Sequence, residues 1–389
     1  MFKGETPGAE GWLDRLVGYD TTSNLSNLAL IDDVAAFLKD HGVAVRLDYN
    51  ADGTKANLFA SIGGSEPGGV VLSGHTDVVP VAGQAWTSDP FSLRLDGDKL
   101  VGRGSADMKG FIAVVLSLVP RFAATPLRVP LHLCFSYDEE VGCQGIGSMI
   151  DLLGRELPQP AIAIIGEPTE MQVVNAHKGI ASLKTRILGK PCHSSQPQNG
   201  VNAIAAAGRL LAEMTVIQEE LKNKAPAQAA DFDPPYTTIN PGRIDGGTAV
   251  NIIAERCRLE WDCRAVPGDS VGLIQHRLQR FAEEKLLPAM RGVHAGAEIV
   301  TEIGVDVPPL LAKPGSPAEE LVLQLTGHNR AVSVPYATEA GLFQDHGIAA
   351  VVCGPGSVLQ AHRPDEFVTL GQLEACRGFL LKLLDWARR

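Results

Sequence analysis

Acidic side chains and a histidine follow apolar runs at several points in the chain. His75 and Asp77 close the run Gly69–Leu72, which is typical of a buried strand. The other acidic residues in similar settings are, in chain order, Asp107, Glu139, Glu140 and Glu167. Because the carboxyl ends of parallel strands share one edge of a sheet, we expect these side chains to converge there. Clustered carboxylates repel one another unless cations hold them, and a pair of divalent metal ions would do so.

The spacing of His75 and Asp77 suits a metal ligand and its support. A lone histidine after a strand is often structural. Asp77, however, stands two residues further along an extended segment and therefore on the same side. There its carboxylate could accept the second imidazole N–H and fix the ring, as carboxylates do for zinc-bound histidine. We therefore expect His75 to be a ligand and Asp77 to orient it.

The adjacent pair Glu139 and Glu140 follows the apolar run Leu131–Phe135. Exposed Glu–Glu pairs are common and usually solvated, but this pair is held at a predicted strand end. One glutamate can bind a metal while its neighbour stays free as the general base for a water molecule. Without a metal, the two ionised neighbours would repel and the pKa of one would rise.

Asp107 lies in the glycine-punctuated stretch Gly102–Gly110, which leads into a predicted helix. A phosphate-binding loop is the alternative interpretation of such a stretch. The spacing Gly102-x-Gly104-x-x-Asp107 lacks a third glycine, and no Walker lysine pattern accompanies it. A carboxylate at this position could instead bridge two cations.

Two further candidates complete the set. Glu167 follows the apolar run Ala161–Ile165, and His362 lies in the stretch Gln360–Glu366. Together the candidates offer imidazole nitrogen and carboxylate oxygen, with no thiolate. This mixture suits hydrolytic zinc, cobalt or manganese better than a structural, cysteine-rich zinc site.

Composition places the chain among globular proteins with a sizeable core. It has 389 residues, 45% hydrophobic and 20% charged, and a formal net charge of −11. The acidic balance argues against nucleic-acid binding, and no apolar stretch is long enough to predict a membrane span. With no signal-peptide pattern at the N-terminus, we expect a cytoplasmic protein. Seven cysteines do not suggest a disulfide framework. Cys192 precedes His193, but neighbours on an extended strand face opposite ways, which disfavours a cysteine nucleophile.

Predicted strands and helices alternate up to residue 178, as in a mostly parallel sheet with helices on both faces. Between residues 179 and 303 the predicted order becomes βαββαβ, which is typical of a ferredoxin-like domain. The simplest architecture is an α/β domain, residues 1–178 and 304–389, interrupted by a second domain, residues 179–303. Within residues 11–42 we expect a single helix, Leu28–His41, with Asn27 as its N-cap.

Three motifs carry a family resemblance: Ser73-Gly-His75-Thr-Asp77, the stretch Gly102–Gly110, and Glu139-Glu140. In this order they resemble the aminoacylase/acetylornithine deacetylase family of metallohydrolases, the M20 family, and the likeness runs over essentially the whole chain. It implies a zinc-exopeptidase-like α/β/α catalytic domain with an inserted ferredoxin-like lid that often dimerises. It also implies two divalent metal ions, zinc or cobalt, and a homodimer that acts on a small N-acyl amino acid.

The resemblance also implies a role for each candidate. In one metal site Asp107 would be joined by His75 and Glu167, and in the other by Glu140 and His362. Asp107 would thus bridge the two ions, and a cis peptide would follow it. Glu139 would be the general base, and Asp77 would orient His75.

Three residues of the lid match functional positions of the family. His193 corresponds to a histidine that reaches a neighbouring active site and stabilises the oxyanion; a surface histidine is the alternative. Asn251 and Arg264 correspond to residues that hold the substrate, and a guanidinium could bind a carboxylate through two hydrogen bonds. A solvated arginine at a strand end is the alternative for Arg264.

The stretch Tyr336–Ala340 is most similar to the subgroup that deacetylates acetyl-ornithine, which places Thr338, Glu339 and Gly356 on the substrate side. The Glu339 carboxylate could meet the cationic amine of such a substrate, whereas Gly341 departs from some members of the subgroup. The implied reaction releases acetate and L-ornithine from N2-acetyl-L-ornithine, in arginine biosynthesis. The alternatives are a desuccinylase, an aminoacylase, a dipeptidase, or a non-catalytic metal- or peptide-binding module.

Overall fold

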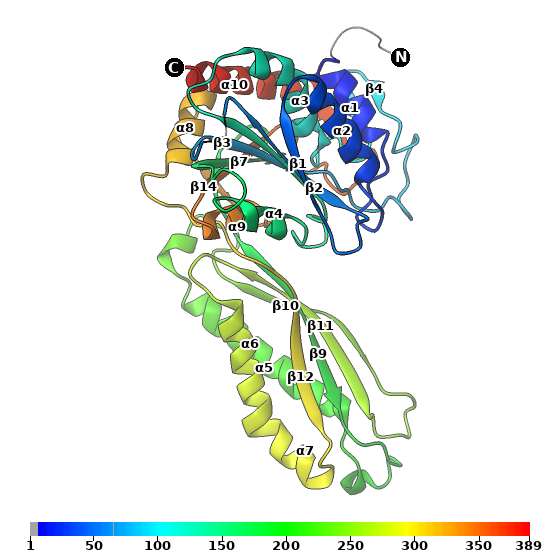
Figure 1. The fold of residues 1–389 in the computed structure, drawn as a ribbon. Coiled ribbons are helices and arrows are strands. Elements are labelled where there is room, and N and C mark those ends of the chain that lie inside the picture. The colour runs from blue at the N-terminus through cyan, green and yellow to red at the C-terminus, as the bar shows by residue number, and fades with distance from the viewer. Residues whose placement is uncertain (1–6, 65) are drawn as a thin grey trace. The chain divides into compact units, whose positions relative to one another are not determined.

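The computed structural model describes residues 7–64 and 66–389, which form two compact units (Figure 1). The first unit comprises the chain up to Ala176, Leu310–Ser333 and Thr338–Arg389. The second comprises His177–Pro309 and Val334–Ala337. The predicted domain boundaries, at residues 179 and 303, lie two and six residues inside the longer segment of the second unit.

An eight-stranded mixed sheet forms the centre of the first unit, in the order β1-β2-β6-β3-β7-β14-β8-β13. Its inner strands are β6 (Leu131–Ser136), β3 (Val70–His75), β7 (Ile162–Pro168) and β14 (Ala349–Gly354). These four strands pair in parallel and are almost entirely buried. The outer strands are β1 (Ala44–Tyr49), β2 (Ala56–Ile62), β8 (Val174–His177) and β13 (Val332–Val334). Because β2 and β8 pair antiparallel to inner strands, the sheet is parallel only at its centre. The predicted α/β class is confirmed.

Helices cover both faces of this sheet (Figure 1). On one face lie α1 (Ala9–Val17), α2 (Leu28–Asp40), α3 (Lys109–Ala124), α8 (Pro317–Thr326) and α10 (Leu370–Ala387). On the other lie α4 (Ile146–Leu152) and α9 (Ala340–Asp345). α3 is apolar along most of its length because α1, α10 and the sheet all pack against it. The expectation of a single helix within residues 11–42 is wrong, since α1 precedes α2.

A small separate sheet connects two loops of the first unit. It contains β4 (Arg94–Asp96), β5 (Lys99–Val101) and β15 (Phe367–Thr369), in the order β15-β5-β4. Phe367 pairs with Val101, so the segment that follows β5 runs beside the segment that precedes β15. The first of these segments contains Asp107 and the second contains His362.

The second unit has the predicted βαββαβ order. Its elements are β9 (Gly179–Leu188), α5 (Ala203–Asn223), β10 (Thr238–Gly246), β11 (Arg256–Ala265), α6 (Val271–Phe281), α7 (Leu287–Val293) and β12 (Glu298–Val307). Short 3₁₀ turns lie at Pro197–Asn199 and Ala227–Ala229, and a π-helical turn, Ala282–Leu286, joins α6 to α7. The strands form an antiparallel sheet in the order β10-β11-β9-β12, with the arrangement of a ferredoxin-like fold. Its core is separate from that of the first unit.

Within the described part of the chain, none of the helices has the length and apolar character needed to cross a bilayer. The seven cysteines all lie in this part and are free thiols. Cys257 and Cys263 are both buried on β11. They serve as packing residues of the second core.

Candidate metal centre

The topology of the inner strands brings most of the predicted ligands to one edge of the sheet. β6, β3 and β7 are parallel neighbours, so their carboxyl ends lie side by side. His75 ends β3, the Glu139–Glu140 pair follows β6, and Glu167 stands next to the last residue of β7. Asp107 comes from the loop before α3, and His362 from the loop before β15. The structure thus brings the five predicted metal ligands together within the first unit.

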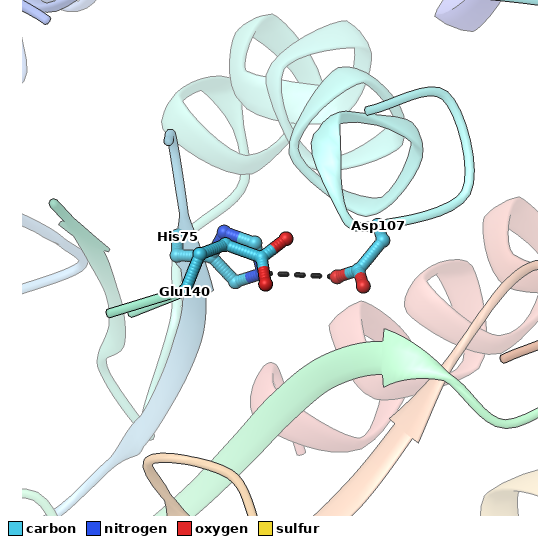
Figure 2. Close-up of side chains that lie close together, drawn as sticks. All are labelled: His75, Asp107 and Glu140. Carbon is cyan, nitrogen blue, oxygen red and sulfur yellow. Dashed lines mark hydrogen bonds and ion pairs between the residues drawn. The ribbon is translucent and has the colours of Figure 1, made fainter. Parts of the chain in front are cut away.

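The two oxygens of Asp107 face two different histidines, as a bridging ligand requires. Oδ1 lies 3.0 Å from His75 Nε2, and Oδ2 lies 3.3 Å from His362 Nε2. Glu167 Oε1 is 3.7 Å from His75 Nε2, and Glu140 Oε2 is 2.9 Å from His362 Nε2. Figure 2 shows the side chains of His75, Asp107 and Glu140 directed toward one another. Asp107 thus lies between the two histidines, with Glu167 near His75 and Glu140 near His362.

The orientation of His75 is set by a backbone carbonyl. Its Nδ1 lies 2.9 Å from the Asp77 carbonyl oxygen and 3.6 Å from Asp77 Oδ1. A carbonyl oxygen only accepts, so Nδ1 donates to it, and Nε2 is directed toward the carboxylates. Asp77 therefore holds His75 mainly through its carbonyl oxygen, while its carboxylate, expected to orient the ring, makes the longer contact.

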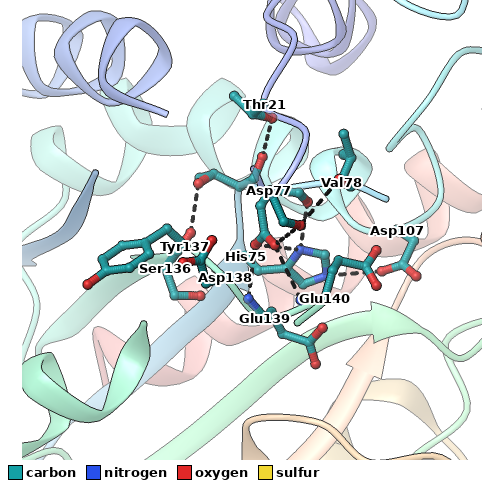
Figure 3. Close-up of polar contacts among 12 residues, drawn as sticks. Thr21, His75, Asp77, Val78, Asp107, Ser136, Tyr137, Asp138, Glu139 and Glu140 are labelled. Atoms are coloured by element: carbon teal, nitrogen blue, oxygen red, sulfur yellow. Dashed lines mark hydrogen bonds and ion pairs between the residues drawn. The ribbon is translucent and has the colours of Figure 1, made fainter. Parts of the chain in front are cut away.

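The carboxylate of Asp77 instead holds the segment that follows β6 (Figure 3). It accepts hydrogen bonds from the backbone N–H of Glu139 at 3.1 Å and of Glu140 at 3.3 Å. The Ser23 hydroxyl donates a third bond to it at 2.7 Å. One buried carboxylate therefore fixes the backbone of both the proposed base and a proposed ligand.

Burial and mutual repulsion disfavour the charged forms of the glutamates. Burial, with repulsion from Asp107, raises the pKa of Glu140 to about 7. The same two causes raise the pKa of Glu167 well above its usual range, and burial does so for Glu139. Hydrogen bonds that His362 donates to the carboxylates of Asp107 and Glu140 raise the pKa of its imidazole to about 10. Four carboxylates and two imidazoles thus lie close together, and a bound cation would relieve the repulsion among the ionised carboxylates.

The chemistry of the donor set fits divalent metal ions. Two groups of described residues have ligand atoms within 4.8 Å of one another: His75 with Asp107 and Glu140, and His75 with Glu139 and Glu167. Carboxylate oxygen and imidazole nitrogen are typical ligands of zinc and related ions at hydrolytic sites. The predicted cis peptide bond between Asp107 and Met108 is also present.

The predicted substrate residues of the first unit are enclosed. Glu339 is 1% exposed, and its carboxylate accepts hydrogen bonds from the hydroxyls of Ser136 at 2.6 Å and Ser73 at 3.4 Å. To meet a substrate amine, this carboxylate would need a local rearrangement. Thr338 is buried and accepts a bond from the Ala340 N–H, and Gly356 lies at φ +90°, where other residues are strained.

The three candidates of the second unit lie near the ends of its strands. His193 is exposed, and its Nδ1 accepts hydrogen bonds from the backbone N–H of Ser195 at 3.1 Å and from the Ser195 hydroxyl at 2.7 Å. Asn251 lies beside it, because the Ser194 N–H donates to the Asn251 carbonyl oxygen. Arg264 is the next-to-last residue of β11, at the end of the strand far from His193 and Asn251, and it contacts the Asp262 carboxylate at 3.2 Å.

Two contacts of the metal centre were not predicted. The thiol of Cys143 donates to Glu139 Oε1 at 3.4 Å, and Ser23 reaches Asp77 from a loop before α2. Cys143 follows Glu139 by only four residues, so its position in the sequence could have indicated the contact. Ser23 lies 54 residues from its partner, so its position offered no such indication.

Comparisons with known proteins agree with this geometry. The sequence profile of peptidase family M20/M25/M40 matches residues 71–386. An acetylornithine deacetylase of Yersinia pseudotuberculosis is 38% identical over 375 residues, which cover 94% of this chain and 92% of that protein. Aminopeptidase PepT of Bacillus cereus has a similar structure, with a TM-score of 0.72 and 20% identity over 97% of both chains. A dinuclear metal-binding M20 peptidase of Bacillus subtilis, YxeP, has a TM-score of 0.64 and 17% identity over 98% of both chains.

The two solved structures share too little sequence with this chain to show more than the fold. The family profile and the deacetylase relative match the sequence itself over most of its length. The predicted ligands and base fall inside the profile match. The chain therefore belongs to peptidase family M20/M25/M40 and is a metal-dependent hydrolase.

Proposed function

We propose that this enzyme removes the acetyl group from N2-acetyl-L-ornithine and releases L-ornithine and acetate in the cytoplasm. The observation that carries this choice of substrate is the relative named acetylornithine deacetylase, 38% identical over 94% of the chain. The site supports the reaction class, because it places a carboxylate that can move protons beside a set of cation ligands.

Two divalent ions, zinc or cobalt, are proposed for the site. His75 and Glu167 would hold one, Glu140 and His362 the other, and Asp107 would lie between them. When bound, such ions make a water molecule more acidic and polarise the amide carbonyl. The remaining chemistry belongs to the residues of the chain.

Glu139 is the proposed general base. Burial raises the pKa of its carboxyl group, which makes the carboxylate a stronger base toward water than an exposed glutamate. The water oxygen forms the new C–O bond, the amide C–N bond breaks, and Glu139 passes the proton to the departing amine. The Asp77 carboxylate holds the Glu139 backbone in place during these steps.

His193 is proposed to stabilise the oxyanion. Because the Ser195 N–H can only donate, His193 Nδ1 is an acceptor and the neutral ring carries its hydrogen on Nε2. An Nε2–H of this kind is the donor that a negatively charged tetrahedral oxygen needs. In the proposed homodimer this ring would serve the active site of the neighbouring copy. Asn251 and Arg264 are proposed to hold the substrate, Asn251 beside His193 and Arg264 from the opposite end of the sheet.

A substrate panel tests the proposal. We expect kcat/KM for N2-acetyl-L-ornithine to exceed that for N-succinyl-diaminopimelate and N-acetyl-methionine by about tenfold or more, the discrimination available to a shaped pocket. A preference for the succinylated substrate would contradict the choice of acyl group. Failure to hydrolyse all three would contradict the reaction class.

A further inference from the structure

We infer that Glu366 is a positioning residue that sets the geometry of the metal centre. It fills the turn Gly102–Asp107 and connects this turn to the loop that carries His362. The inference rests on the proposed metal centre, because Asp107 and His362 are two of its ligands.

Six consecutive residues donate hydrogen bonds to Glu366. Its carboxylate accepts bonds from Arg103 Nη1 (2.6 Å), Gly104 N (3.0 Å), Ala106 N (2.9 Å) and Asp107 N (3.0 Å). Its carbonyl oxygen accepts bonds from Gly102 N (2.9 Å) and Ser105 Oγ (3.3 Å). Both side chains of the Arg103–Glu366 pair are 1% exposed. The turn is thus wrapped around one buried residue.

This arrangement explains the glycine pattern of the turn, for which a phosphate-binding loop was the alternative interpretation. Gly104 has φ +78°, and the amides of Gly104, Ala106 and Asp107 converge on one anion, as in the backbone nests that bind phosphate. The anion here is the carboxylate of Glu366, from the same chain. The glycine pattern therefore serves an internal ligand.

A second set of contacts extends from Arg103 to His362. Arg103 Nη2 donates to Gln84 Oε1 at 2.5 Å, and Gln84 Nε2 donates to the His362 carbonyl oxygen at 3.0 Å. The Trp86 indole N–H donates to the same Gln84 oxygen at 2.9 Å, and the Arg103 guanidinium lies over the Trp86 ring. Glu366 therefore contacts the backbone of Asp107 directly and that of His362 through Arg103 and Gln84.

The consequence is a fixed spacing between two ligands. Asp107 Oδ2 and His362 Nε2 lie 3.3 Å apart although 255 residues separate them in the sequence. Loss of the Glu366 charge would leave Arg103 and backbone amides in the interior without their acceptor, and the turn would have to move. Residues that hold metal ligands in place typically change metal affinity by about 10- to 100-fold when substituted.

Chelator competition with cobalt or zinc tests the inference on the full chain. We expect Glu366→Gln to weaken metal binding by about 10- to 100-fold. Gln84→Met keeps the turn around Glu366 but removes the hydrogen bond to the His362 carbonyl oxygen. It should therefore lower the affinity only for the ion that His362 would bind. Asp96→Asn is the matched control, because it neutralises the exposed Arg94–Asp96 pair, and should bind metal like the wild type.

The unfolding midpoint of the metal-free variants, followed by circular dichroism, separates positioning from folding. If Glu366→Gln has a lower unfolding midpoint than the wild type but binds metal as tightly in the chelator competition, the role of Glu366 is purely structural. That result would overturn the inference. If Glu366→Gln does not fold, unchanged metal binding in Gln84→Met overturns it instead. A wild-type chain that binds no divalent ion would contradict the proposed function, a result seen before any variant is compared.

Discussion

Glu139 is held from two sides, at its backbone N–H by the Asp77 carboxylate and at its side chain by the Cys143 thiol. Asp77 in turn uses its carbonyl oxygen to hold His75. The proposed base and a proposed ligand therefore share one support, in which the carboxylate and the carbonyl of a single residue have separate tasks. A change at Asp77 would disturb both.

His177 is a buried histidine outside the metal centre, and it predicts a pH dependence of stability. Burial lowers the pKa of its imidazole from 6.5 to about 4, so the folded chain keeps it neutral. Between these values the unfolded chain binds a proton that the folded chain does not, and stability falls as the pH falls. The full effect is about 3 kcal/mol.

We therefore expect His177→Gln to reduce the acid sensitivity of the metal-free protein. The free energy of unfolding, measured by urea titration above pH 6.5 and near pH 4, should fall less in the variant than in the wild type. His276→Gln, which changes an exposed histidine of α6, is the control and should behave like the wild type. Equal losses in wild type and His177→Gln would refute the assignment.

At the scale of elements, β7 and α3 pack so closely that only glycine fits between them. A Cβ on Gly166 would lie 2.0 Å from Phe111 Cγ, whereas a Cβ on Gly208 of α5 would meet nothing within 4 Å. Gly166 precedes the ligand Glu167, and Phe111 lies in the first turn of α3, shortly after Asp107. The contact therefore joins the elements that carry two ligands.

The two glycines give opposite predictions. Gly166→Ala should lower the free energy of unfolding by about 1–3 kcal/mol, because the overpacked side chain must displace Phe111 or β7. Gly208→Ala should raise it by up to about 1 kcal/mol, since alanine is the better residue inside an exposed helix. Chemical denaturation of the metal-free proteins measures both. An unchanged free energy of unfolding in Gly166→Ala would show that β7 and α3 can move apart without loss of stability.

The elements that the sequence predicted best are those with strong apolar runs. The strand predicted at the apolar run Leu131–Phe135 is β6, Leu131–Ser136, because six buried residues leave little choice of boundary. β1 was missed although Val45, Leu47 and Tyr49 alternate with Arg46 and Asp48, because the strand is short and its residues are exposed or half-buried. α1 was missed as well; it is short and has no side-chain cap. Asn27 is the N-cap residue of α2, as predicted, but its side chain makes no capping bond and instead donates to Ala56 and Thr76.

The convergence of the candidate site follows from the strands for some ligands, whereas the pairing of the loop residues Asp107 and His362 was implied only by the family resemblance. His75, Glu140 and Glu167 stand at the ends of recognisable strands, so their convergence follows from parallel pairing. His362 is brought in by the β5–β15 pairing and by Glu366, which are contacts between segments far apart in the sequence. No local pattern marks such contacts.

At the scale of the whole molecule, each unit has its own core and its own share of the proposed chemistry. The proposed metal ligands and base all belong to the first unit, while His193, Asn251 and Arg264 belong to the second. Metal binding and proton transfer are thus assigned to one unit, and the proposed oxyanion donor to the other.

The most direct test of the central claim, metal-dependent hydrolysis with Glu139 as the base, is one rate measurement. Acetate release from N2-acetyl-L-ornithine is followed with metal-depleted protein before and after zinc or cobalt is added, for the wild type and for Glu139→Gln. We predict that the depleted wild type is inactive and regains activity with metal. Glu139→Gln should bind the same amount of metal and remain slower by about 100- to 10,000-fold, the usual contribution of a general base. Full activity without metal, or wild-type turnover in Glu139→Gln, would contradict the account.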